Sequence, residues 1–131
     1  MIPKLRVFVK AGTKPFFGGH VYDEDQMIYD VISIDVYHKE ISVWGCDKKY
    51  YGIGSLTYDM EDVNIMMSTK MKDKNGIEIY EYSELDGVYE VIFKDLKYNL
   101  RYIPNNYIID LHDYWRDKNG EIEVTREYTK V

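Results

Sequence analysis

Apolar and polar positions alternate along most of the chain, with a period of two residues. Leu5, Val7 and Val9 alternate with the residues between them, and the same pattern returns in segment after segment. A period of two is typical of β-strands, because successive side chains point to opposite faces of a sheet. The pattern predicts strands over residues 5–10, 27–37, 41–44, 65–71, 77–80, 88–94, 97–103 and 121–128.

Two segments depart from this alternation. Leu56, Met60 and Val63 are spaced as on a helix, so we expect one short helical turn over residues 56–63. Residues 107–115 fit either a strand or a short helix, because Leu111 and Trp115 share helical spacing. The prediction is at most one or two short helices.

The clearest turn signal is Asn75-Gly76, which lies between two alternating runs. Asn-Gly is the preferred pair for a two-residue type I′ hairpin turn, in which both central residues have positive φ. A similar phrase, residues 116–120, ends in Asn119-Gly120, and we interpret it as the same hairpin turn used again. Residues 11–20 hold three Gly and one Pro and predict a loop, in which Phe16 and Phe17 are expected to plug the end of the core.

Composition supports a mainly β fold. The chain has 131 residues, which suits one domain, and 14 of its 20 aromatic residues are Tyr. Ile, Val and Tyr favour strands, while the single Ala disfavours a helical bundle. Short strands separated by turn signals predict a small β-barrel or sandwich. We expect an N-terminal β-hairpin region over residues 1–60 and a barrel region over 61–131; the alternative is one continuous domain.

Charge and targeting features narrow the function classes. The formal net charge is −6, which argues against nucleic-acid binding because that binding depends on cation–phosphate contacts. No signal peptide and no membrane-spanning apolar run are visible. Cys46 is the single cysteine, so no intrachain disulfide forms, which fits a reducing cytoplasm and equally a secreted protein without disulfides.

One phrase also resembles a known family. Residues 72–81, Lys-Asp-Lys-Asn-Gly-Ile-Glu-Ile-Tyr-Glu, resemble a signature of the YopX-like proteins of phages and prophages in Gram-positive bacteria. Residues 68–71, 23–29 and 122–124 match other family phrases in part, but after Glu81 the family's Gly-Asp turn is missing. The resemblance implies a small β-rich protein from a bacterial host's cytoplasm, with an SH3-like barrel in its second half. It brings no catalytic residues.

Candidate catalytic and metal-binding residues are weak. Cys46 and the three histidines His20, His38 and His112 lack the close paired spacing of zinc ligands. The acidic run 23–25 lacks the pattern of a calcium loop, and no phosphate-binding or nucleophile-elbow motif is present. The carboxylate pairs 113/117 and 59/62 are not distinguished from the other acids. We therefore expect no catalytic residues, no cofactor and no metal, and a protein that is not an enzyme.

The remaining candidate is an aromatic interaction surface. Its members are Tyr50, Tyr51, Tyr98, Tyr102, Tyr107, Tyr114 and Trp115. SH3-like barrels bind extended peptides on aromatic surfaces, but packing in the core or between subunits is the commoner reason for such residues. Stacking of single-stranded nucleic acid is a third interpretation, which is disfavoured because such platforms pair with a basic groove. The expected function is protein–protein interaction or self-assembly as a homo-oligomer, with a protein partner and no membrane. The alternative is a nucleic-acid-binding accessory protein in phage DNA metabolism.

Overall fold

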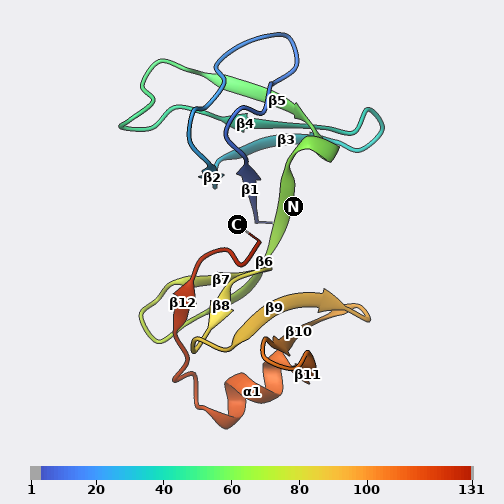
Figure 1. The fold of residues 1–131 in the computed structure, drawn as a ribbon, viewed down its shortest axis with the longest axis vertical. Helices are drawn as coiled ribbons and strands as arrows, with labels where there is room; N and C mark the ends of the chain where they lie inside the picture. Colours follow the sequence, from blue (N-terminus) through green and yellow to red (C-terminus); the bar gives the residue numbers. More distant parts are fainter. Residues whose placement is uncertain (1–3, 131) are drawn as a thin grey trace. The chain divides into compact units, whose positions relative to one another are not determined.

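The computed structural model describes residues 4–130 and is mainly β, as predicted (Figure 1). This part of the chain forms twelve strands, one α-helix and one 3₁₀ turn. The strands are β1 (Leu5–Val9), β2 (Gln26–Ile28), β3 (Val31–Asp35), β4 (Glu40–Trp44), β5 (Ser55–Asp59), β6 (Asn64–Lys72), β7 (Glu78–Tyr80), β8 (Glu84–Leu85), β9 (Tyr89–Lys94), β10 (Lys97–Tyr102), β11 (Tyr107–Asp110) and β12 (Val124–Arg126). The helices are η1 (Met60–Asp62) and α1 (Leu111–Asp117).

The chain divides into two compact units. The N-terminal unit is Leu5–Met66, and the C-terminal unit is formed by residues 67–130 together with Lys4. The division falls inside β6, a few residues after the expected boundary at residue 60. None of the described helices is long and apolar enough to cross a bilayer.

The N-terminal unit is built on an antiparallel three-stranded sheet with the order β3-β4-β5. Ile41 on β4 lies opposite Tyr58 on β5, and Val43 lies opposite Leu56, so all four share one face. That face is buried, and β1 and β2 pair beside each other in the same unit. The core consists of Val7, Val9, Tyr22, Ile28, Ile41, Val43, Leu56, Tyr58 and Val63.

The C-terminal unit contains an antiparallel five-stranded sheet with the order β11-β10-β9-β8-β12. Val91 on β9 lies opposite Leu100 on β10, and Leu111 of α1 packs in the same cluster. The core consists of Ile79, Leu85, Val91, Leu100, Leu111 and Ile122. The fold includes a curled sheet that makes half of a barrel.

Residues 27–37 do not form the single long strand that their alternation predicts. The chain leaves β2 after Ile28, and β3 begins at Val31 and carries a register shift against β4. The shift turns side chains to the opposite face, because the side-chain period of a strand is two. As a result Ile32, which was expected beside Ile28, is exposed. Val36, expected on the same face, is exposed because it lies beyond β3, in the turn before β4.

Other segments also depart from the prediction. The short helical turn predicted within residues 56–63 is present as η1, but it covers only Met60–Asp62, and residues 56–59 belong to strand β5. Residues 107–115, predicted as either a strand or a helix, form both. The predicted strand 121–128 is ordered as β12 over three residues. Phe17 is 90% exposed, so the interpretation of this residue as a plug for the core is wrong.

The two Asn-Gly phrases have different structures. In the first, Asp73 pairs with Ile77 through a backbone hydrogen bond of 2.8 Å, and only Gly76 of the central residues has positive φ. This is a three-residue loop with a left-handed glycine, so the predicted type I′ turn is wrong. The second phrase ends helix α1, and the interpretation as a repeated hairpin turn is wrong as well.

Candidate binding pocket of the N-terminal unit

The pocket forms where β4 leaves the sheet and enters the loop of residues 45–54. The loop is closed at its base, because the Gly45 N–H donates to the Gly54 carbonyl at 2.8 Å. The Gly54 N–H in turn donates to Cys46 Sγ at 2.6 Å. Gly54 has φ of +80°, a conformation that glycine adopts without steric cost. These contacts hold Cys46 between the two ends of the loop.

The second wall comes from the link between β2 and β3. The Trp44 N–H donates to the Asp30 carbonyl at 2.8 Å, which fixes the link beside the end of β4. Ile41 and Val43 face the core, so Trp44 is left outside it and is 47% exposed. An indole with half of its surface in water is available to a partner.

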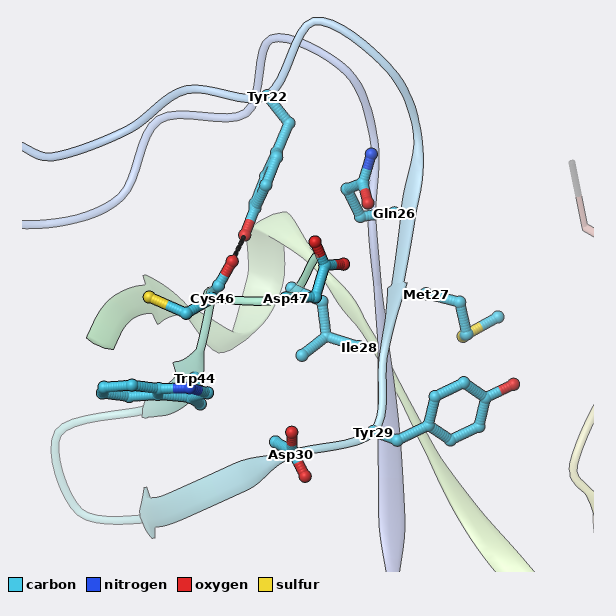
Figure 2. A pocket seen from close by; sticks show the side chains of 10 residues that line it. Tyr22, Gln26, Met27, Ile28, Tyr29, Asp30, Trp44, Cys46 and Asp47 are labelled. Carbon is cyan, nitrogen blue, oxygen red and sulfur yellow. Dashed lines mark hydrogen bonds between the residues drawn. The ribbon is translucent and has the colours of Figure 1, made fainter. Parts of the chain in front are cut away.

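Two cavities share Trp44 and Cys46. The deeper one measures about 170 Å³ and the shallower one about 290 Å³. The deeper cavity is lined by Tyr22, Gln26, Met27, Ile28, Tyr29, Asp30, Trp44, Gly45, Cys46 and Asp47 (Figure 2). The shallower one is lined by Trp44, Cys46, Tyr51, Gly52 and Gly54. Together they make a hollow with an aromatic residue at its centre.

A cluster of aromatic rings supports the pocket from inside. The Tyr22 hydroxyl donates to the Gly45 carbonyl at 3.0 Å, and the Tyr22 ring lies edge-on to Tyr50 at 4.8 Å between centroids. The His20 ring packs on the Tyr22 ring, with 4.9 Å between centroids. Burial, and next the nearby Asp47, raise the pKa of Tyr22, so its hydroxyl stays a neutral donor.

The polar lining is acidic. Asp47 Oδ1 accepts hydrogen bonds from the Lys49 and Tyr50 N–H groups, both at 2.8 Å, which orients its carboxylate. Within residues 4–130, neither Asp30 nor Asp47 forms an ion pair. Lys49 is paired with Glu24 at 2.5 Å. The N-terminal unit holds six Lys and Arg against ten Asp and Glu, a formal charge of −4.

The aromatic residues predicted as an interaction surface fall in both units. Tyr50 and Tyr51 belong to the N-terminal unit, and the other five belong to the C-terminal unit. Tyr51 is 93% exposed and lines the shallower cavity, whereas Tyr50 supports the pocket through a hydrogen bond from Gln26 Nε2 at 3.1 Å. The structure therefore places one predicted residue, Tyr51, at the hollow.

Most of the tyrosines of the C-terminal unit are held by internal contacts. The Tyr98 hydroxyl donates to the Ser68 carbonyl at 3.2 Å, and the Tyr114 hydroxyl donates to Asp86 at 2.6 Å. Tyr102 lies opposite Tyr107 on β11, and its ring contacts that of Tyr89 at 5.4 Å. Tyr107 is 65% exposed and Trp115 is 38% exposed. These two keep the most surface for a partner.

Cys46, His20 and His38 make separate contacts, and His112 is exposed. Cys46 Sγ accepts from Gly54, His20 packs on Tyr22, and His38 Nδ1 lies 2.6 Å from Asp35. The hydrogen bond to Asp35 raises the pKa of His38. Among residues 4–130, no group of three or more His, Cys, Asp or Glu side chains is placed to hold a metal ion.

Sequence reasoning missed the central residues of the pocket, Trp44, Asp30 and Asp47. A signal for Trp44 was present, because in the strand 41–44 it alternates with the apolar pair Ile41 and Val43. The position of Asp30 depends on the break between β2 and β3, which the alternation conceals.

Comparison with protein-family models, with curated proteins and with solved structures gives no match.

Proposed function

We propose that this chain is a non-catalytic protein-interaction module, and that the N-terminal unit binds a segment of a partner protein in the hollow around Trp44. The observation that carries the proposal is a half-exposed indole at the junction of two cavities. Trp and Tyr are enriched among the residues that dominate binding energy at protein interfaces. Tyr51, at the rim, adds a second exposed aromatic ring.

The size of the pocket favours a protein segment over a small molecule. Pockets for drug-sized ligands measure about 300–1,000 Å³, and the deeper cavity, at about 170 Å³, is smaller. A cavity of this size accepts the end of one side chain. The adjoining shallower hollow then provides contact area for the neighbouring residues of the same segment.

Lys97 and Arg101, in the C-terminal unit, give no support to the nucleic-acid alternative. Lys97 Nζ lies 3.0 Å from Asp110, and Arg101 Nε lies 2.9 Å from Glu90. Both cations are thus neutralised by acids of their own unit, whereas a phosphate-binding groove presents free cations.

The resemblance to YopX-like phage proteins agrees with an accessory, non-enzymatic role and stays a prediction. Assembly into a homo-oligomer also stays a prediction.

Selection from a random peptide library on the immobilised protein tests the proposal. We expect a family of peptides that bind the wild-type protein and lose at least tenfold in affinity on Trp44→Ala, measured by fluorescence anisotropy. The matched control is Trp115→Ala, which removes the other half-exposed indole. Circular dichroism and thermal melting establish that both variants are folded.

Two results would contradict the proposal. Failure to select any peptide that distinguishes wild type from Trp44→Ala removes the pocket as a binding site. Peptides that lose affinity on Trp115→Ala and keep it on Trp44→Ala assign binding to the aromatic surface of the C-terminal unit instead.

A further inference from the structure

We infer that the deeper cavity of the N-terminal unit receives a cationic side chain, arginine or lysine, from the partner segment. The inference rests on the proposed function and specifies the chemistry of the residue that anchors the partner. It is drawn from the placement of two carboxylates and one indole around a cavity of about 170 Å³.

The carboxylates and the indole lie on the same side of β2. In Figure 2 the side chains of Asp30, Asp47 and Trp44 lie to one side of this strand, and those of Met27 and Tyr29 are directed to the other. Two N–H groups of its own loop orient the Asp47 carboxylate, and the hydrogen bond from Trp44 to the Asp30 carbonyl fixes the backbone of Asp30 beside the end of β4. The Asp47 carboxylate is therefore a fixed part of the wall, and the Asp30 side chain starts from a fixed backbone.

No ion pair within residues 4–130 neutralises these charges. Neither the Asp30 nor the Asp47 carboxylate forms an ion pair among residues 4–130. Lys49, two residues after Asp47, forms its ion pair with Glu24. Lys48, next to Asp47, is exposed and belongs to no ion pair in this part of the chain. The N-terminal unit has a formal net charge of −4, so the surface around the cavity attracts a cation and repels an anion.

The chemistry of the walls suits the two parts of a long basic side chain. Ile28 and Trp44 offer apolar surface to its methylene groups, and the indole face attracts a guanidinium or ammonium group. A carboxylate accepts two hydrogen bonds from arginine in one plane, so arginine is the preferred occupant. An apolar side chain in the same place would cover the carboxylates of Asp30 and Asp47 without supplying a counter-charge, which is unfavourable.

The peptides selected on the wild-type protein test the inference directly. We expect them to share an Arg or Lys at one position, and replacement of that residue by citrulline, the neutral counterpart of arginine, to weaken binding at least tenfold. Asp30→Asn and Asp47→Asn are each expected to weaken binding at least fivefold. Asp62→Asn makes the same charge change in the exposed turn η1, away from the cavity, and is expected to leave affinity within twofold.

The outcomes separate this inference from the proposed function. Peptides that depend on Trp44 but carry no common basic residue, or that bind equally well with citrulline, overturn the cationic anchor and leave the interaction module standing. Equal losses on Asp62→Asn and Asp30→Asn also overturn it, because attraction would then come from net charge and not from the cavity. If no peptide depends on Trp44, the proposed function fails, and the inference fails with it.

Discussion

The carboxylate of Asp73 accepts a hydrogen bond from the Val124 N–H at 2.9 Å, although 51 residues separate the two in the chain. Its other oxygen accepts from the Asn75 and Ile77 N–H groups at 2.9 and 2.8 Å. Asp73 is only 6% exposed. One buried side chain thus shapes the loop between β6 and β7 and fastens that loop to the start of β12.

Replacement of Asp73 by Asn is expected to destabilise the protein by about 1–3 kcal/mol, because an amide has one accepting oxygen and leaves a buried N–H without its partner. Guanidinium denaturation gives the change in the free energy of unfolding. Asp95→Asn is the matched control, since Asp95 is exposed and Asn tolerates its positive φ of 55°. Equal stability of wild type and Asp73→Asn would contradict the role of this carboxylate.

The same carboxylate predicts a pH dependence. Burial raises the pKa of Asp73, but the N–H groups of Val124, Ile77 and Asn75 outweigh burial, and the pKa lies below its ordinary value. A lowered pKa in the folded state stabilises the protein fully above the unfolded pKa, about 3.9. The stabilisation is lost as pH falls from about 4 through the folded value. We expect the Asp73→Asn variant to lose less stability than wild type between pH 5 and pH 2, measured by urea denaturation.

The alternation of apolar and polar residues predicted most of the strands, but it did not predict where one long apolar run breaks into two strands. It placed β4, β9 and β10 within a residue or two, because one face of each strand packs in a core. It failed at residues 27–37, where the chain breaks at Tyr29 and Asp30 without a glycine or proline to mark the break. The break depends on contacts with the end of β4, which a single segment does not reveal.

The two Asn-Gly phrases show why local motifs are ambiguous. The left-handed glycine is correct in both, at Gly76 and Gly120, because both positions need positive φ. Whether the glycine lies in a hairpin loop or at the end of a helix depends on the element that precedes it. Strand β6 precedes the first phrase and helix α1 precedes the second, where the Gly120 N–H donates to the Trp115 carbonyl at 2.9 Å. This contact is typical of a helix C-terminus.

The two glycines predict different costs of substitution. Gly76→Ala is expected to cost about 1–2 kcal/mol, because only the positive φ of 79° is unfavourable and a Cβ there meets no atom within 4 Å. Gly120→Ala is expected to cost more, since a Cβ would also lie 3.2 Å from the Trp115 ring. Thermal melting compares the two variants. A Gly76→Ala variant that is the less stable of the two would contradict this account.

The residues of the pocket were only partly accessible to sequence reasoning. The predicted interaction surface was chosen by residue type and therefore consists mainly of tyrosines. Most of those in the C-terminal unit make internal contacts with their hydroxyls or rings, as Tyr98 and Tyr114 do. Trp44 was identifiable from its place in a strand. Its nearness to Asp30 follows from one backbone hydrogen bond between segments 14 residues apart, which no periodicity encodes.

Tyr58 carries a buried hydroxyl that finds no hydrogen-bond partner among residues 4–130. Burial, and next the nearby Tyr22, raise the pKa of Tyr58 to about 12. Because a buried polar group without a partner is unfavourable, Tyr58→Phe is expected to leave the free energy of unfolding unchanged or to raise it by up to about 1 kcal/mol. Chemical denaturation measures it. A loss above about 1 kcal/mol would show that the hydroxyl is hydrogen-bonded in solution.

Gly45, at the junction of β4 and the pocket loop, has less room for a Cβ than Gly52 or Gly54 of the same loop. A Cβ on Gly45 would lie 2.7 Å from the Tyr22 hydroxyl oxygen, 3.0 Å from Ile53 and 3.1 Å from Leu56. Overpacking of this kind costs about 1–3 kcal/mol. We expect Gly45→Ala to lose stability in that range, measured by guanidinium denaturation. Gly52→Ala, in the same loop with positive φ and open space, is the control for backbone strain alone.

The Tyr22 hydroxyl makes the shortest of these contacts, so a second variant isolates its share. In a Tyr22→Phe background the closest atom is gone, and Gly45→Ala is expected to cost less than it does in the wild-type chain. The difference between the two costs is the coupling between residues 22 and 45, and residues in direct contact show couplings of about 0.5–3 kcal/mol. Equal costs in both backgrounds would mean that Ile53 and Leu56 alone resist the added methyl group. The Tyr22 hydroxyl would then not control the close packing at the floor of the pocket.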